Sequence, residues 1–109
     1  MILSQKRVGD FVILRIGENR VDSTNFGALQ ERVSSLVGEG DSKFVLDLSA
    51  VIFMDSCGLA GLIPAAYDVP VNGRFLLAGL TPRVEQVFRL TKLDTIFDIY
   101  PSIADALMS

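Results

Sequence analysis

Two short stretches of the chain, residues 44–48 and 74–80, are apolar almost throughout and lack the polar alternation of a half-exposed strand. Such strands are typical of parallel sheets, in which helices cover both faces. Parallel strands also need a long crossover connection. A segment with helical periodicity, from about residue 56 to 67 or 68, lies between the two stretches. We therefore predict an α/β chain whose central sheet is parallel in its middle.

Periodicity and turn residues place the remaining elements. Strands are predicted at residues 2–8 and 11–16, joined as a hairpin, with a short edge strand at residues 96–100. Further helices are predicted from residue 23 or 24 to 37, from 81–82 to about 90–92, and from 101–102 toward the C-terminal end. The 109 residues amount to one domain. The predicted architecture is a single α/β domain over residues 1–109, with a mixed sheet of about five strands and about four helices.

Two of these helices have distinctive ends or interiors. Asp22, Ser23 and Thr24 are candidate N-caps of the first helix, and Gly38 is a candidate for its C-terminal cap. Pro64 falls inside the second helix, where the loss of a hydrogen bond and a steric clash cost roughly 3 kcal/mol. The apolar face predicted for this second helix consists of Leu59, Leu62, Ile63, Ala66 and Tyr67.

The composition narrows the classes of function. The chain has no histidine, so it cannot build a Ser–His–Asp or Cys–His pair, and a zinc site would need an uncommon ligand set. We therefore expect a protein that is not an enzyme and holds no cofactor. A net charge of −3 gives no basic patch, so nucleic acid is not an expected partner. No apolar run approaches the roughly 18–20 residues of a membrane span, so no membrane association is expected.

The single cysteine, Cys57, rules out a disulfide within the chain. The N-terminal residues also lack the order of a signal peptide, because their charges follow the apolar residues. Together these features predict a protein of the reducing cytoplasm.

Residues 54–59, Met-Asp-Ser-Cys-Gly-Leu, bring polar chemistry to the junction between a strand and a helix. Ser56 is interpreted as a helix cap that can also be exposed, where a phosphate would add close to two negative charges beside the helix dipole. Asp55 is a second candidate cap rather than a catalytic base. Cys57 is assigned to packing, although a thiol at a helix N-terminus can become a nucleophile. Asp47, at the end of a strand, is expected to hydrogen-bond loop backbone rather than perform chemistry.

The chain resembles STAS domains, and among them most closely the anti-sigma factor antagonists. The resemblance extends along most of the chain, and its motifs follow the strand–helix order of that family. It implies a single STAS domain over residues 1–109. The motifs are Val21-Asp22, Val45-Leu46-Asp47-Leu48, Phe53-Met54-Asp55-Ser56-Cys57-Gly58-Leu59, Gly73-Arg74-Phe75-Leu76-Leu77-Ala78-Gly79-Leu80 and Thr81-Pro82-Arg83-Val84.

The resemblance implies a mechanism of partner switching. In such antagonists the serine directly after the aspartate, here Ser56, is phosphorylated by an anti-sigma factor that is a serine kinase with a histidine-kinase-like ATP fold. The unphosphorylated antagonist binds this kinase and releases a sigma factor or another target, and a metal-dependent serine phosphatase restores it. ATP and metal belong to those partners. The residues implied in partner binding are Asp22, Asp55, Ser56, Cys57 and Gly58.

Two other functions remain open at this point. One is a constitutive STAS adaptor, a subunit of a transport or signalling assembly in which Ser56 only caps the helix. The other is an enzyme or an aspartyl-phosphate receiver that uses Asp47 or Asp55. The prolines of the segment 64–72 depart from the longer, charged helix that is usual in the family.

Overall fold

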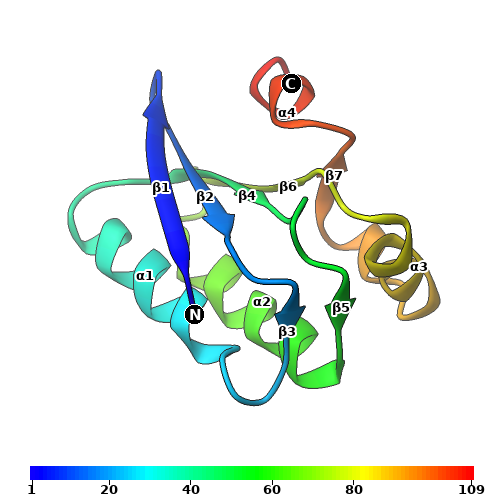
Figure 1. The fold of residues 1–109 in the computed structure, drawn as a ribbon. Coiled ribbons are helices and arrows are strands. Elements are labelled where there is room, and N and C mark those ends of the chain that lie inside the picture. The colour runs from blue at the N-terminus through cyan, green and yellow to red at the C-terminus, as the bar shows by residue number, and fades with distance from the viewer.

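The computed structural model describes residues 1–109 as a mixed sheet with helices on both faces (Figure 1). The sheet has five strands in the order β1-β2-β4-β6-β7. β1 and β2 pair antiparallel, and the other neighbours pair parallel, which confirms the predicted hairpin and parallel centre. The strands are β1 (Leu3–Val8), β2 (Phe11–Ile16), β4 (Lys43–Asp47), β6 (Arg74–Ala78) and β7 (Asp98–Tyr100).

Helices connect the strands and cover the sheet unequally. α1 and α2 lie side by side against one face, and α4 alone covers the other (Figure 1). The structure thus confirms the predicted α/β class and the four helices. None of them combines the length and the apolar character that crossing a membrane requires. The helices are α1 (Gly27–Gly38), α2 (Ser56–Asp68), α3 (Pro82–Leu90) and α4 (Ile103–Leu107), with a 3-10 turn η1 (Leu93–Thr95) after α3.

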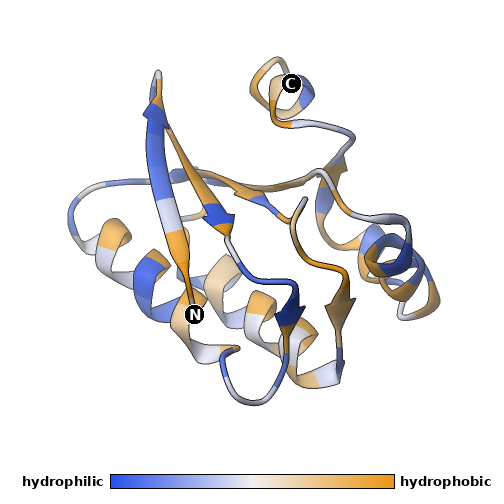
Figure 2. Cartoon of the chain, viewed as in Figure 1, coloured by the Kyte–Doolittle hydropathy of each residue, from blue (hydrophilic) through white to orange (hydrophobic).

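Side-chain alternation along β4 divides the core between the two faces of the sheet. Phe44 and Leu46 belong to the cluster that includes the buried residues of α1 and α2, whereas Val45 belongs to the cluster beneath α4. All three side chains are fully buried. The inner strands are accordingly among the most hydrophobic parts of the chain (Figure 2). Burial on both faces is the reason why residues 44–48 show no polar alternation.

A second, two-stranded sheet pairs β3 (Arg20–Val21) with β5 (Phe53–Met54). The sequence indicates a strand before residue 55 but gives no signal for β3 or for the pairing. Each strand has only two residues, too few for any alternation to be visible. The strands pair in parallel, with Val21 opposite Met54. The backbone carbonyl of Asn19 also accepts hydrogen bonds from the N–H groups of residues 52 and 53, at 2.9 and 3.0 Å. This small sheet ties the segment before α1 to the segment before α2.

The start of α1 differs from the prediction. The helix begins at Gly27 rather than at residue 23 or 24, and residues 23–26 form a turn that leads into it. Asp22 does not cap the helix, because its carboxylate accepts the backbone N–H and the hydroxyl of Thr24. An aspartate carboxylate that accepts the backbone N–H two residues ahead stabilises a turn, and this turn replaces the start of a helix. The predicted caps are therefore wrong.

The end of α1 also differs from the prediction. Gly38 lies inside the helix instead of capping it. The left-handed backbone that favours glycine is found two residues later, at Gly40, with φ +105°. Of the two neighbouring glycines, the helix therefore incorporates the first and ends before the second.

α2 runs without interruption through Pro64, and its buried face is only partly the predicted one, since Leu59 and Leu62 are buried as predicted and Ala66 packs against the core. Ile63 and Tyr67 are exposed, Tyr67 by 84%. The helix is turned by its contact with the start of α1, where a Cβ on Gly61 would lie 2.6 Å from the backbone oxygen of Phe26. Small residues allow this close approach, so they face α1 and share the buried side. The buried residues of α2 are Gly58, Leu59, Gly61, Leu62 and Ala65.

Candidate functional site

The turn between β5 and α2 is organised around Asp55. This residue has extended backbone, with φ −96° and ψ −174°, and its Oδ1 accepts the N–H of Gly58 at 2.9 Å. Its backbone oxygen accepts the N–H of Leu59 at 3.0 Å. Asp55 is therefore the N-cap of α2, as predicted for it, and the prediction that Ser56 caps the helix is wrong.

Ser56 is the first residue of α2, and its side chain is exposed. Because the carboxylate of Asp55 already accepts the N–H of Gly58 in the first turn, the Ser56 hydroxyl has no capping role. It lies beside the free N–H groups of the first turn, at the positive end of the helix dipole. An anion on this hydroxyl would meet a favourable field, which a helix start provides for phosphate groups in general.

Asp55→Ala is expected to lower the free energy of unfolding by about 1 kcal/mol, because the N–H of Gly58 loses its acceptor. Asp55→Asn keeps an acceptor oxygen and should cost about half of that or less. Urea unfolding followed by circular dichroism measures both variants. Equal losses in the two variants would contradict the capping role.

The pairing of β3 with β5 places Asp22 beside this turn. Val21 lies opposite Met54, and its backbone oxygen accepts the N–H of Asp55 at 3.4 Å. A Cβ on Gly58 would lie only 2.4 Å from the same oxygen, so the first turn of α2 packs directly on β3. β3, β5 and the start of α2 lie together at one end of the domain (Figure 1). The structure thus brings Asp22 and residues 55–58, all predicted from the sequence, to one region.

The carboxylate of Asp22 is held by the turn that follows it. Its Oδ1 accepts the hydroxyl of Thr24 at 2.6 Å and the N–H of the same residue at 3.0 Å. The Nε of Arg20 lies 3.6 Å from its Oδ2. The hydrogen bonds from Thr24, and to a smaller extent the charge of Arg20, hold the pKa of Asp22 below its ordinary value.

Asp22→Asn is expected to weaken the dependence of stability on acid pH. Because folding lowers the pKa of Asp22, its stabilisation is fully present above the unfolded pKa of about 4 and is lost as the pH falls through the lower, folded pKa. The difference in unfolding free energy between wild type and Asp22→Asn should therefore shrink below about pH 4. Urea unfolding at a series of pH values measures this difference. A difference that stays constant across the series would contradict the assignment.

Further side chains, to which the sequence gave no role, complete the surroundings of Asp22. Asn25 accepts the N–H of Asp22 at 2.9 Å, and its Nδ2 donates to Glu18 at 2.7 Å and to the backbone oxygen of Arg20 at 2.9 Å. The guanidinium of Arg20 lies 4.4 Å from the ring centroid of Phe53, a cation–π contact across the small sheet. The hydrogen bonds of Asn25 stay within residues 18–25, whereas the cation–π contact depends on the pairing of β3 with β5, which has no signal in the sequence.

The fold of the chain recurs in known proteins. The sequence model of the STAS domain matches residues 3–106. The chain belongs to the STAS domain family. The predicted family is thereby confirmed, and the sheet order and helix positions described above are those of a STAS domain.

The relatives of this STAS domain include anti-sigma factor antagonists. The anti-sigma-F factor antagonist RsfB of Mycobacterium tuberculosis is 28% identical over 95 residues, which cover 87% of this chain and 77% of that protein. The crystal structure of an anti-sigma factor antagonist from Mycobacterium paratuberculosis has a TM-score of 0.87 and 25% identity, covering 98% of this chain and 91% of that chain. Bacillus SpoIIAA in its phosphorylated form shares the fold, with a TM-score of 0.71 at 18% identity over 97% and 96% of the two chains. The STAS domain is therefore similar, over most of its length, to proteins named as anti-sigma factor antagonists.

The remaining candidate residues of the STAS domain have structural positions. Cys57 is half-buried in the first turn of α2. Asp47 is buried at the end of β4, and its Oδ1 accepts the N–H of Ser49 at 2.9 Å, which confirms its predicted role in holding loop backbone. Asp47 points to the α4 side of the sheet, away from α2, since it alternates with the neighbouring residues of β4. No three histidine, cysteine, aspartate or glutamate side chains come together as a metal site would need.

Proposed function

We propose that this STAS domain is an anti-sigma factor antagonist that binds an anti-sigma factor with serine kinase activity, and that phosphorylation of Ser56 by this partner ends the binding. The observation that carries the proposal is the exposed hydroxyl of Ser56 at the first position of α2. The hydroxyl is accessible to another protein, and the cap supplied by Asp55 leaves it free of a structural role.

A phosphate on Ser56 would act at the surface and leave the fold intact. It would change the net charge from −3 to about −5 at a single exposed point. The helix dipole favours the added charge, whereas the neighbouring carboxylate of Asp55 opposes it. Because the two effects oppose each other, the phosphate changes the stability of the domain little. A partner surface packed on Ser56, by contrast, would have to remove water from the phosphate, which is unfavourable. The domain would therefore stay folded and lose its partner.

The surroundings of Ser56 support a protein partner. Asp22, Asp55 and Cys57 lie beside Ser56 on adjoining segments, and we assign these four residues to the surface that contacts the kinase. Gly58, which the sequence also assigned to partner binding, is buried against β3 and would act only by shaping the turn. The chain itself has no histidine to deprotonate a serine, so the base and the ATP would come from the partner. A separate metal-dependent serine phosphatase would restore the unmodified form. The phosphorylated form of SpoIIAA, a protein with the same fold, agrees with this scheme.

Incubation with the cognate kinase and ATP tests the proposal. Mass spectrometry should find one phosphate, located on Ser56, and Ser56→Ala should accept none. The phosphate should survive acid, because a phosphoserine is stable where an aspartyl phosphate hydrolyses. An acid-labile phosphate would instead indicate a receiver that uses Asp47 or Asp55. A protein that remains unmodified by kinases encoded beside its gene would favour a constitutive adaptor.

A further inference from the structure

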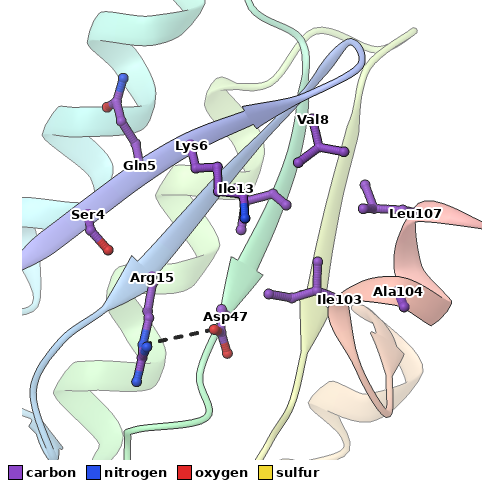
Figure 3. Close-up of a pocket in the computed structure, with 10 residues that line it drawn as sticks. All are labelled: Ser4, Gln5, Lys6, Val8, Ile13, Arg15, Asp47, Ile103, Ala104 and Leu107. Carbon is purple, nitrogen blue, oxygen red and sulfur yellow. Dashed lines mark ion pairs between the residues drawn. The ribbon is translucent and has the colours of Figure 1, made fainter.

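A cleft of about 570 Å³ lies on the face of the sheet opposite α1 and α2 (Figure 3). It exists because α4 is short and packs on β4, β6 and β7, so that β1 and β2 have no helix over them on this side. The cleft separates the exposed surface of this hairpin from α4. Its volume falls within the roughly 300–1,000 Å³ typical of small-molecule sites. The residues that line it are Ser4, Gln5, Lys6, Val8, Ile13, Arg15, Asp47, Ile103, Ala104 and Leu107.

The floor and one wall of the cleft are apolar. Ile13 of β2 forms the floor and is 7% exposed. Ile103 and Leu107 of α4 face it from one side, and Val8 closes the upper end of the view in Figure 3. These side chains offer a strip of hydrocarbon surface between the hairpin and the helix.

Two cations stand beside this apolar strip. Lys6 is paired with Ile13 across the hairpin, and Arg15 is two residues further along β2. Diagonal neighbours of this kind are about 7–8 Å apart, a separation that one small anion can bridge. Figure 3 shows Lys6 beside Ile13, and Arg15 directed toward Asp47 at the lower end of the cleft.

The positive charge of the cleft is only partly compensated. Arg15 approaches Asp47 with its Nε 4.0 Å from Oδ2, and Lys6 has no carboxylate partner in the structure. By contrast, Arg7 lies 2.6 Å from Asp41 on the other side of the hairpin. Two cations and one carboxylate leave the cleft with an excess of one positive charge, in a chain whose net charge is −3. A monoanion would balance this excess, whereas a dianion would exceed it and face Asp47.

We propose that the cleft binds a small amphipathic carboxylate, of the class of medium-chain fatty acids. Its carboxylate would lie between Lys6 and Arg15, and its chain along Ile13 and the two apolar residues of α4, Ile103 and Leu107. A fully apolar ligand would leave the cations unpaired, and a purely polar anion would leave the hydrocarbon strip exposed to water. The site lies across the sheet from Ser56 and is independent of its phosphorylation.

Titration with decanoate, kept below the concentration at which it forms micelles, tests this site. We expect saturable binding with a dissociation constant on the order of 1 mM or below, seen as NMR shifts of backbone amides in β1, β2 and α4. The double variant Lys6→Gln/Arg15→Gln should weaken the binding at least about ten-fold. Arg7→Gln is the matched control, because it removes a neighbouring cation on the opposite face of β1, and it should change the affinity less than about two-fold.

Two further measurements test whether the ligand must be an anion and whether it is a free carboxylate or a lipid in a membrane. Decyltrimethylammonium, with the same chain and the opposite charge, should not bind. Vesicles of phosphatidylglycerol should not compete with decanoate. The proposal is overturned if the double variant binds decanoate as wild type does, if the cationic analogue binds equally, if only vesicles bind, or if the shifts are confined to α2. Ser56→Ala should leave decanoate binding unchanged, so a failure of the phosphorylation proposal would not affect this result.

Discussion

Ser56→Asp is expected to weaken binding to the kinase partner by at least about 30-fold, or 2 kcal/mol, and to leave the domain folded. Ser56 is exposed at the first position of α2 and takes no part in the cap. A carboxylate there is compatible with the helix, since acidic residues are favoured in the first turn. At an interface the same carboxylate must lose its water and would lie beside the charge of Asp55. The substitution therefore separates partner binding from stability.

Isothermal titration against the kinase, together with urea unfolding of the free domain, measures both quantities. Ser34→Asp is the matched control, because it adds the same charge at an exposed position of α1, away from the start of α2. It should leave the affinity within about two-fold of wild type. If Ser56→Asp binds as tightly as Ser34→Asp, the assignment of Ser56 to the interface is wrong. If Ser56→Asp unfolds the domain, the assignment of a non-structural hydroxyl is wrong.

Gly58→Ala is expected to lower the free energy of unfolding by about 3 kcal/mol. The added Cβ would lie 2.4 Å from the backbone oxygen of Val21 and 2.9 Å from Cγ of Met54. A methionine side chain can rotate away, but a backbone oxygen can move only with its strand. The substitution would therefore push β3 from α2, and with it Asp22 from the turn that carries Ser56.

Gly38→Ala is the matched control for Gly58→Ala, because it adds the same methyl group at a helical glycine with nothing within 4 Å. It should raise the free energy of unfolding by up to about 1 kcal/mol, since alanine favours the helix over glycine. Urea unfolding of both variants measures the contrast. Similar changes in the free energy of unfolding of the two variants would contradict the prediction, because they would show that β3 can move away from α2 at little cost.

Much of the fold could be predicted because its strongest signals are local. The apolar stretch 44–48 reflects burial on both faces of one strand, and the hairpin reflects a turn at Gly9-Asp10. The helix that begins at Pro82 and the last helix, which Ser102 caps through the N–H of Asp105 at 3.1 Å, also carry their signals within a few residues. The candidate site was found for a similar reason, since the motif of residues 54–59 is contiguous.

The predictions that failed concern choices between equivalent local alternatives. Asp55 and Ser56 are both good caps, and the sequence does not show which of them holds the extended backbone. Ile63 and Tyr67 fit the apolar period of α2 as well as the residues that are in fact buried. In each case the choice between the candidate residues depends on the space that a segment distant in the sequence leaves, β3 for the start of α2 and residue 26 for its buried face.

The sequence by itself determined the α/β class, the parallel centre of the sheet and the position of the serine between a strand and a helix. These properties follow from composition and periodicity within single elements. Only the tertiary structure decided that Asp22 lies beside Asp55, that Gly58 packs on the backbone of Val21, and that a cleft remains beside α4. Each of these depends on contacts between segments far apart in the chain. The two-residue strands that make the first contact are too short to show that they pair with each other, and the cleft reflects where α4 lies relative to the hairpin.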